Sequence, residues 1–482
     1  MDVFSGRLMN AGDSKQKRKK GIDHSMQKTT DLTQGPITRQ LLWFALPIFL
    51  SSLLNQVYYL VDTLIISTFL GDAALGAVTN CLNLVWLITS FVFGIGMGMN
   101  VVVAQAFGAK NYKWMHRAEY SGIAGAVVAS LCLALLAWPV SEPILRLMQT
   151  PEEVIGLSAS YLVPILAGSG GQMLFMICAG ITQAAGDSKT PLYFLVFASC
   201  LNIALDLLFI AVLHVGIAGA AYATLIAQWL TGIMMVIYLC RVNAVYRIEF
   251  KKIRIYKDAF KEILRMGIPG AVESSATAFA NTLVQTFVNT FGMAAMAACG
   301  AFATIEGFCF LPITAFCEAL GTFAGQNAGA RNEARTRKGV KISVVMMMAT
   351  CMVIGLAVLA MLPMLLSIFV HNPESLAFGL ERGKVTLLFY PVLGLTHCLA
   401  AVFRGTGKPV IPMIAYLGSW GVIRVILLWS VLPVWHSFTF LAAVYPITWT
   451  ISSVFLCVYY WKGNWFGSRE ASDPDEEALA AV

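Results

Sequence analysis

Long apolar segments separated by short polar ones form the main pattern of this sequence. Each segment is about 20 residues long or more, which is the length that crosses a bilayer as a helix. Twelve such segments can be delimited, at residues 41–67, 78–107, 118–141, 154–184, 190–213, 216–240, 262–290, 297–329, 342–370, 385–403, 409–432 and 438–461. Because a helix satisfies its own backbone polar groups in hydrocarbon, the pattern predicts an all-α integral membrane protein with twelve transmembrane helices.

The composition agrees with this prediction. Of the 482 residues, 58% are hydrophobic and only 12% are charged, whereas about a quarter of the residues of a soluble domain are charged. The eleven cysteines lie within or at the ends of the apolar segments and show no CxxC spacing, which indicates neither a disulfide framework nor a metal site. The sequence also lacks HExxH, GxSxG and P-loop motifs, so we expect neither an enzyme nor a bound cofactor.

The distribution of basic residues orients the predicted helices. When the loops are assigned alternately to the two sides, only Arg146, Arg382 and Lys384 fall opposite the termini, and Arg424 falls within a segment. The remaining 29 of the 33 Lys and Arg residues lie on the side of the termini. This excess predicts that both termini are cytoplasmic, in the plasma (inner) membrane, and it explains the net charge of +7 without a nucleic-acid partner. The basic segments fit contact with anionic membrane lipids instead.

The second half of the chain repeats the first at an offset of 221 to 222 residues. Pro47 corresponds to Pro269, each near the start of an apolar segment. Two longer matches pair AQAFGAKN at 104–111 with GQNAGARN at 325–332, and ITQAAGDSKTP at 181–191 with VFRGTGKPVIP at 402–412. Six helices per repeat is an even number, so the two halves have the same orientation and are related by a pseudo-two-fold axis along the membrane normal.

The repeat predicts two six-helix lobes and divides the chain into five parts. These are a disordered cytoplasmic tail at 1–36, an N-terminal lobe at 37–240, a cytoplasmic linker at 241–261, a C-terminal lobe at 262–461 and a cytoplasmic tail at 462–482. Transporters built in this way hold their substrate between the repeats and alternate its access by rocking one lobe against the other.

The first apolar segment carries a single carboxylate, Asp62. A charge at the bilayer centre costs roughly 2.5–3.5 kcal/mol even on insertion-based scales, so Asp62 should face protein, water or a cation. The same segment contains Pro47, whose missing N–H and ring clash open the helical ladder and predict a bend. We interpret Pro47 as a conformational hinge.

Asn202, Asp206 and Thr224 are candidates for the same site as Asp62. Asn202 and Asp206 are four residues apart and therefore share a helix face. At 1.5 Å per residue, Asp62, Asp206 and Thr224 each lie roughly 12 to 14 Å below the outer surface. Carboxylate, amide and hydroxyl oxygens at one depth predict a site for Na⁺ or for a shared proton. The alternative is that these residues are satisfied buried polar groups that only hold the lobe together.

Three further carboxylates, Glu273, Glu306 and Glu318, fall within apolar segments of the second half. Glu306 and Glu318 are twelve residues apart, or about 120° around a helix, so they need not share a site. We expect Arg424 to be a structural counter-ion for one of these carboxylates, and a role in closure is the alternative. His397, alone in an apolar segment, is interpreted as a core residue.

Several of these stretches together resemble the multidrug and toxic compound extrusion (MATE) transporters, over nearly all of residues 37–461. The resemblance depends on VDTLIISTFLG at the end of the proline-led first segment, on the doubled QxxGA[KR]N sequence, and on NIALD in the fifth segment. It implies two six-helix lobes in a V shape, and export of cationic, amphipathic compounds in exchange for Na⁺ or H⁺.

The resemblance also implies which residues bind the ion. The first-lobe ion site of the family falls here on Asp62, Asn202, Asp206 and Thr224. One branch of the family has a second site, built from a Glu in the middle of the seventh segment and an Asp in the tenth. Here the tenth segment has no carboxylate, and Glu273 lies near the cytoplasmic end of its segment. The resemblance therefore does not extend to that second site.

Together these observations predict a monomeric, cation-coupled antiporter for small organic cations. Tyr58, Tyr59, Met173 and Met176 could offer such a cargo aromatic and thioether surface, but these residue types are common in membrane helices, so the substrate site stays unassigned. The alternative is a flippase for a lipid-linked saccharide, which would favour a cleft lined by Arg and Lys. A membrane-embedded transferase or hydrolase is a third possibility, against which the missing catalytic motifs argue.

Overall fold

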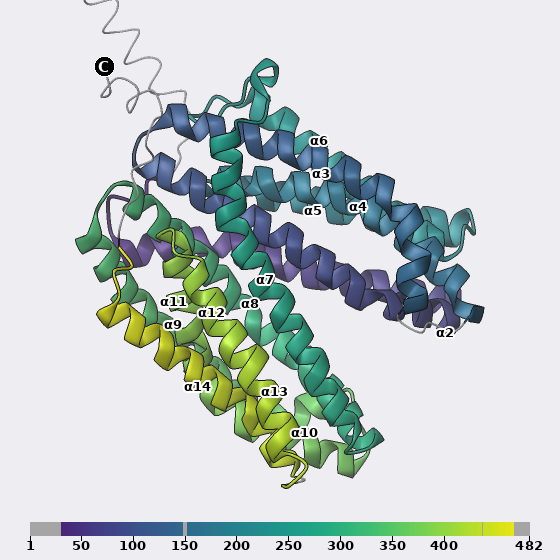
Figure 1. Cartoon of the computed structure of the whole chain (residues 1–482). Coiled ribbons are helices and arrows are strands. Elements are labelled where there is room, and N and C mark those ends of the chain that lie inside the picture. The colour runs from purple at the N-terminus through teal and green to yellow at the C-terminus, as the bar shows by residue number, and fades with distance from the viewer. Residues whose placement is uncertain (1–29, 148–151, 436, 467–482) are drawn as a thin grey trace, which may run out of the picture.

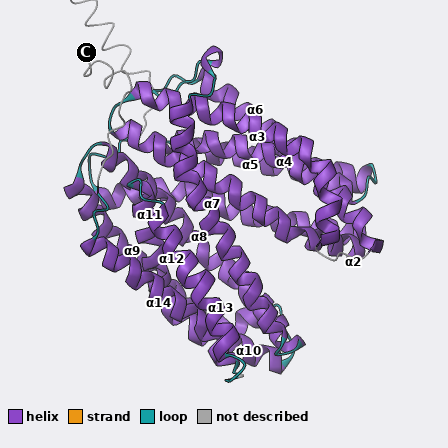
Figure 2. Cartoon of the chain, viewed as in Figure 1, coloured by secondary structure: helices purple, strands orange, loops and turns teal. Residues whose placement is uncertain are grey.

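The computed structural model describes residues 30–147, 152–435 and 437–466, and in these residues the chain is helical, without strands (Figure 2). The long helices in chain order are α2 (Ile37–Gly108), α3 (Tyr112–Leu147), α4 (Glu152–Ala184), α5 (Lys189–Asp206), α6 (Ile217–Arg241), α7 (Lys257–Asn289), α8 (Met293–Gly329), α9 (Glu333–Ser367), α10 (Pro373–Thr386), α11 (Tyr390–Gly405) and α14 (Phe438–Lys462). Two shorter helices, α12 (Val410–Tyr416) and α13 (Arg424–Ile426), alternate with the π-helical turns Leu417–Ile423 and Leu427–Val431. The predicted all-α fold is confirmed.

Two bundles of helices meet at one end of the molecule and diverge toward the other (Figure 1). The bundle of α2–α6 is called the first lobe below, and the bundle of α7–α14 is called the second lobe. Helix α2 begins and α14 ends where the bundles meet, and this region is called the junction end (Figure 1). The V-shaped arrangement that the resemblance implied is therefore visible in the ribbon.

Each lobe contains an apolar core, and a few side chains of the other lobe pack into it. In the first lobe the side chains of Met99, Ile177 and Leu239 are fully or almost fully buried, and they come from α2, α4 and α6. In the second lobe Phe302 and Phe403 are fully buried. In lipid, burial of this kind reflects close packing between helices more than a hydrophobic driving force.

Helix α2 joins the first two predicted segments, 41–67 and 78–107, without an intervening loop. Gly71 interrupts it, with φ 77° and ψ −174°. A methyl group added at Gly71 would meet nothing within 4 Å, so the positive φ rather than crowding requires glycine here. The two segments are thus two helices joined directly by one residue.

Eleven stretches of the described residues are long and apolar enough to cross a membrane, two of them in α2. The one remaining predicted segment, the seventh in chain order at residues 262–290, is helical as well and forms most of α7. It is not among the eleven, because it is more polar than the others. Figure 1 shows α7 between the two bundles of helices.

The predicted loops around the tenth segment were wrong at both ends. Helices α10 and α11 extend from Pro373 to Gly405 with a short 3₁₀ turn between them, whereas the sequence predicted a span at 385–403 only. Arg382, predicted in an outer loop, is 7% exposed and lies in α10. Arg404, predicted in a loop on the side of the termini, lies near the end of α11, and its side chain is 11% exposed. A segment predicted from hydropathy ends at a charged residue. The helix itself can continue past that residue when the charge is paired with an opposite one inside the protein.

The amino-terminal tail was predicted to be disordered over residues 1–36. Residues 1–29 lie outside the described residues, but residues 30–36 have defined positions, and the side chain of Leu32 is fully buried. The final tail was predicted at 462–482; α14 ends at Lys462, Trp465 is fully buried, and residues 467–482 lie outside the described residues.

The lobes meet through the two QxxGA[KR]N sequences. A methyl group added at Gly108 of α2 would lie 1.8 Å from the carbonyl oxygen of Gln326, and one added at Gly329 of α8 would lie 1.9 Å from the carbonyl oxygen of Gln105. A Cβ at either position would overlap the facing backbone, so glycine is required at both. The repeated sequence therefore forms part of the contact between the lobes.

Candidate functional site

The four residues predicted to form a cation site come together in the first lobe. Asp62 lies in the first half of α2, Asn202 and Asp206 lie in α5, and Thr224 lies in α6. The side chains of Asn202 and Asp206 are 2% and 0% exposed. A helix delivers both to one face because four residues make slightly more than one turn. The spacing of Asn202 and Asp206 in the sequence was thus enough to predict that these two side chains lie on one face of α5.

Direct contacts link the members of the cluster. Asn202 Nδ2 donates a hydrogen bond to Thr224 Oγ1 at 3.3 Å, and the hydroxyls of Tyr58 and Thr224 are also 3.3 Å apart. The carboxyl groups of Asp62 and Asp206 lie close enough to interact with each other. Three helices therefore bring one amide, two hydroxyl groups and two carboxyl groups to a single place.

Several oxygen atoms of this cluster have no hydrogen-bond partner although they are buried. They are Asp62 Oδ1, Asn202 Oδ1 and both carboxyl oxygens of Asp206. Buried polar atoms are normally paired, and two buried carboxylates that face each other repel unless a positive charge lies between them. The geometry therefore fits a proton or a small cation bound by oxygen.

The donor set also indicates the kind of ion that the cluster could hold. Na⁺ and H⁺ suit carboxylate, amide and hydroxyl oxygens, whereas zinc and other soft metals prefer histidine and thiolate. Among the described residues, no three or more His, Cys, Asp and Glu side chains are grouped so that they could hold a metal ion.

A π-helical turn, Leu207–Val212, starts directly after Asp206. Such turns widen the helix by one residue and occur often at functional sites. Here the turn follows the buried carboxylate toward the end of the molecule where the lobes diverge. It gives α5 a place where the backbone around Asp206 departs from a regular α-helix.

Aromatic side chains surround Asp62. The rings of Tyr58 and Tyr59 are 5.2 Å apart, and that of Tyr59 is 6.5 Å from the ring of Trp86. Tyr161 of α4 is 7% exposed and lies close enough to Asp62 to interact electrostatically. The sequence drew attention to Tyr58 and Tyr59 but not to Tyr161 or Trp86, because no spacing rule connects them to the carboxylates.

Pro47, the predicted hinge, lies in α2, fifteen residues before Asp62 and outside the cluster. Its carbonyl oxygen accepts a hydrogen bond from Ser51 Oγ at 2.9 Å, as is common where a helix bends or could bend. The hinge role stays a prediction.

The carboxylates of the second lobe have basic partners that the sequence did not identify. Glu273 of α7 accepts a hydrogen bond from Arg404 of α11 at 2.8 Å, and both side chains are about nine-tenths buried. Glu318 of α8 also lies within electrostatic reach of Arg404. Arg404 therefore serves two carboxylates, one of which it contacts directly.

Glu306 forms a separate cluster, as its angular separation from Glu318 allowed. Arg382 Nη2 lies 3.4 Å from Glu306 Oε2, and the Tyr390 hydroxyl donates to Glu306 Oε1 at 3.2 Å. The guanidinium groups of Arg382 and Arg424 lie over the ring of Tyr445, at 5.1 and 4.8 Å from its centre. Cation–π contacts of this kind stabilise buried guanidinium groups.

Arg424 was predicted to be a counter-ion for one of the three glutamates, and it lies within electrostatic reach of Glu306. Its two terminal nitrogens donate to Asn281 Oδ1 at 3.1 Å and to Thr448 Oγ1 at 3.0 Å. The counter-ions of Glu273 and Glu306 are Arg404 and Arg382, which the hydropathy windows had placed in loops. The sequence did contain a signal for these pairs: each arginine lies close to the end of an apolar segment, and a glutamate within another apolar segment had no assigned counter-ion.

His397 lies in an aromatic pocket of the second lobe, as a core histidine would. Its ring lies 5.0 Å from that of Phe310, and its Nδ1 atom is 3.1 Å from the Tyr416 hydroxyl.

The architecture and the site define a class: a duplicated, two-lobed helical membrane protein with a cluster of buried oxygen atoms inside one lobe. The profile of the MatE family matches the chain twice, at residues 47–208 and 269–430. These matches cover more than half of the chain, and the chain belongs to the MatE family.

Curated relatives are similar along most of their length. The probable multidrug resistance protein YpnP of Bacillus subtilis is 30% identical over 400 residues, which cover 82% of this chain and 89% of that protein. The probable multidrug resistance protein NorM of Thermotoga maritima is 24% identical over 80% of this chain and 83% of its own.

Solved structures have the same fold. A transporter of the MOP superfamily from Pyrococcus furiosus superposes with a TM-score of 0.84 at 20% identity, over 92% of this chain and all of that one. An outward-facing multidrug resistance transporter of the MATE family superposes with a TM-score of 0.82, also at 20% identity, over 95% of this chain and all of its own. At this level of identity the superpositions show the fold alone.

Proposed function

We propose that this protein is a cation-coupled antiporter that exports amphipathic, mostly cationic organic compounds by alternating access between its two lobes. The observation that carries the proposal is the cluster of unpartnered, buried oxygen atoms of Asp62, Asn202 and Asp206. The names of curated relatives, which refer to multidrug resistance and multidrug export, support an organic cargo.

In the proposed cycle, Na⁺ or H⁺ enters the cluster and neutralises the repulsion between Asp62 and Asp206. This brings α2, α5 and α6 closer, and the strain bends α2 at Pro47. Charge compensation inside a low-dielectric lobe is a large energetic effect, so the ion's arrival can change the balance between two conformations.

The aromatic surface next to Asp62 fits an organic cation. The side chains of Tyr59 and Trp86 are 43% and 56% exposed, and they lie beside each other on the two halves of α2. Aromatic faces near a carboxylate attract ammonium groups through both cation–π and Coulombic interactions. We propose that this surface contributes to the substrate site.

The orientation and assembly follow from the same features. We propose that the junction end is cytoplasmic, because most basic residues lie on the side of the termini, and that the membrane is the plasma (inner) membrane. Because one chain supplies both lobes and the interface between them, we propose that the protein acts as a monomer.

A flippase for lipid-linked saccharides is not favoured. Pyrophosphate would need free basic groups inside the molecule. Two of the three guanidinium groups buried in the second lobe, those of Arg382 and Arg404, are already paired with carboxylates.

The test is efflux of ethidium from cells, and its uptake into inside-out vesicles in which Na⁺ and pH gradients are imposed separately. Asp62→Asn keeps the shape of the side chain but removes its charge, and it should abolish efflux at unchanged expression. Asp258→Asn, the same exchange at a partly exposed residue 3.8 Å from Arg117, is the matched control. Unchanged efflux in Asp62→Asn would refute the site, and equal efflux without either gradient would refute ion coupling.

A further inference from the structure

Residues 30–35, called the strap below, lie between the lobes at the junction end, immediately before α2. Thr30 N donates to the carbonyl oxygen of Gly186 in the first lobe at 3.3 Å. Leu32 N donates to Gln326 Oε1 in the second lobe at 2.9 Å, and the Leu32 side chain is fully buried in the core of that lobe. This short segment therefore contacts both lobes.

The second lobe holds the strap through its backbone carbonyl groups. Asn327 Nδ2 donates to the carbonyl oxygen of Leu32 at 3.2 Å. Arg335 Nε donates to the same oxygen at 3.1 Å, and Arg335 Nη1 donates to that of Gly35 at 2.8 Å. The third donor of this guanidinium, Nη2, reaches Gln40 Oε1 at 2.8 Å. One side chain thus fixes the strap and the first turn of α2 together, as the fork of donors on arginine allows.

The first lobe meets the strap backbone to backbone at Gly186. A methyl group added there would lie 2.1 Å from the carbonyl oxygen of Thr30, and Gly186 has a φ of +90°. Both the close approach and the backbone angle require glycine. The fit shows that this turn of the first lobe is shaped around the strap.

Gln326 joins the strap to both lobes. Its Oε1 atom accepts from Leu32 N, and its Nε2 atom donates to the carbonyl oxygen of Ala184 in the first lobe at 2.8 Å. If the lobes separate at this end, the bond to Ala184 breaks. The strap, which is bonded on one side to Gly186 and on the other to Gln326, cannot then keep both attachments.

The equivalent contact on the other side of the pseudo-two-fold axis lacks a strap. Gln105 Nε2 donates to the carbonyl oxygen of Gly405 at 2.8 Å, which mirrors Gln326 and Ala184. Next to it, Gly407 has a φ of +83° like Gly186, but a methyl group added there would meet the Gln105 side chain at 3.2 Å instead of a chain segment. The lobe contact is therefore duplicated, and the strap is an addition to one copy.

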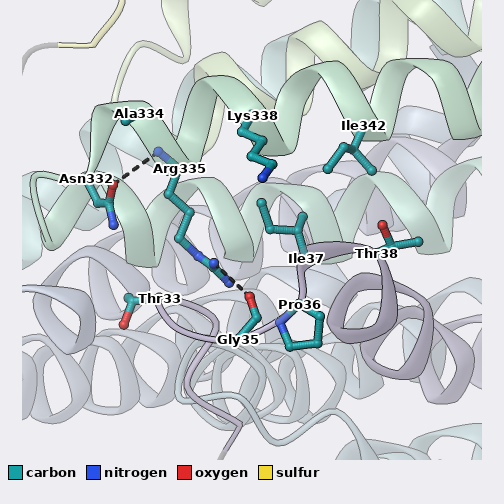
Figure 3. A pocket seen from close by; sticks show the side chains of 10 residues that line it. All are labelled: Thr33, Gly35, Pro36, Ile37, Thr38, Asn332, Ala334, Arg335, Lys338 and Ile342. Atoms are coloured by element: carbon teal, nitrogen blue, oxygen red, sulfur yellow. Dashed lines mark hydrogen bonds between the residues drawn. The ribbon is translucent and has the colours of Figure 1, made fainter.

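A cavity of about 530 Å³ lies beside the strap, between it and the first turns of α9 (Figure 3). Thr33, Gly35, Arg335 and Lys338 are among the residues that line it. Figure 3 shows Arg335 reaching across to Gly35. On the side of this cavity the strap is held by hydrogen bonds, so Thr33 and Gly35 can detach without opening a core, whereas release from Gln326 also withdraws the Leu32 side chain from the core of the second lobe.

We propose that the strap is a latch that holds the junction end closed, and that opening of this end requires its release. The inference rests on the proposed alternating access, in which the junction end must open once in each cycle. It adds a specific barrier to that step: the strap must leave Gln326, Asn327 and Arg335, or else leave Gly186.

The test measures strap release and lobe separation in the same full-length protein, in lipid nanodiscs without substrate or gradient. Hydrogen exchange of the peptide that contains residues 30–35 reports release. Electron–electron distance measurements between spin labels at Tyr112 and Glu333, attached through noncanonical amino acids because the chain contains native cysteines, report separation. These two exposed positions begin α3 and α9 on opposite lobes at the junction end.

Arg335→Ala is the main variant, and Lys341→Ala, at an exposed position of the same helix, is the control. In Arg335→Ala we expect strap amides to exchange roughly ten times faster, because the bonds that order the segment are lost. We also expect a longer label distance to become populated. The control should match the unmodified protein in both measurements.

Faster exchange of the strap with an unchanged label distance would overturn the latch, since the strap would then be released without effect on the lobes. If Arg335→Ala fails to fold or leaves exchange unchanged, deletion of residues 2–35 removes the strap outright. Lobes that stay closed after that deletion would also overturn the proposal, and lobes that open would support it. Because neither measurement involves transport, failure of the latch and failure of the Asp62 site remain distinguishable.

Discussion

The two lobes share a scaffold but differ in how they balance buried charge. The repeat offset of 222 residues carries Asp62 of the first lobe onto Val284, a buried apolar residue. At the end of α5 the offset is 221 or 222 residues, so the segment with Asn202 and Asp206 corresponds to the segment of the second lobe that contains Arg424. Where the first lobe has unpartnered oxygen atoms, the second lobe has a guanidinium among apolar and aromatic side chains.

The difference lies in how each lobe compensates its buried charges. In the second lobe the positive charges are covalently attached: Arg424 lies in the segment that corresponds to the end of α5, and Arg382 and Arg404 pair with Glu306 and Glu273. In the first lobe nothing of this kind compensates Asp62 and Asp206. We infer that only the first lobe takes up an ion from solution.

The largest expected effect follows from removing the second carboxylate of the first lobe. Asp206→Asn should reduce ethidium efflux at least about tenfold, because the ion would lose its charged partner in a site that is out of contact with water. Glu306→Gln, at a carboxylate already paired in the second lobe, is the comparison. If the two variants lost efflux equally, the contrast between the lobes would be wrong.

The next effect concerns stability in the second lobe. Arg404→Leu leaves Glu273 without its partner and should lower the free energy of unfolding by about 3–5 kcal/mol, the usual cost of breaking a buried ion pair from one side. Thermal unfolding followed by intrinsic fluorescence measures it. The double variant Glu273→Gln with Arg404→Gln should recover part of the loss. A double variant less stable than Arg404→Leu would contradict the pairing.

Arg424 should matter less than Arg404, because its direct partners are neutral. Arg424→Gln removes the contacts to Asn281 and Thr448 and should cost about 1–3 kcal/mol, the range for leaving buried polar groups unpaired. Arg424→Lys keeps the charge and should be milder. If Na⁺ stabilised Arg424→Gln more than the unmodified protein, this would support the view that the guanidinium of Arg424 supplies a positive charge that the second lobe otherwise needs.

The smallest effect distinguishes the two copies of the lobe contact. Gln105→Ala removes one hydrogen bond between the lobes, whereas Gln326→Ala removes one to Ala184 and one from Leu32. At about 0.5–1.5 kcal/mol for each bond, Gln326→Ala should destabilise the protein roughly twice as much. The comparison uses the same unfolding measurement. Equal effects would mean that the strap adds no stability to its side.

Sequence reasoning found the features that depend on spacing and depth. The repeat, the all-α fold and the grouping of Asp62 with Asn202, Asp206 and Thr224 needed only helix geometry and the expense of burying charge in lipid. The structure brings these four residues together. Their ion-binding role is still a proposal, because geometry does not show occupancy.

The features that were missed depend on contacts between distant residues. Arg382 and Arg404 were assigned to loops because a charge ends an apolar window, and the glutamates that pair with them lie 76 and 131 residues away. The order of residues 30–36 was missed because a polar segment rich in Thr, Gln and Gly carries no periodic signal. Its position depends on Gln326 and Arg335, about 300 residues later.

The continuity of α2 from the strap to Asp62 sets a constraint on its length. From Ile37 onward the helix contains no break before Gly71, so the direction in which Asp62 points is fixed by the number of residues that separate it from the anchored start. Inserting one residue after Pro47 would turn the carboxylate by about 100° and advance it by about 1.5 Å. The number of residues between the start of α2 and Asp62 therefore determines, as much as the identity of the side chains, whether Asp62 faces Asp206.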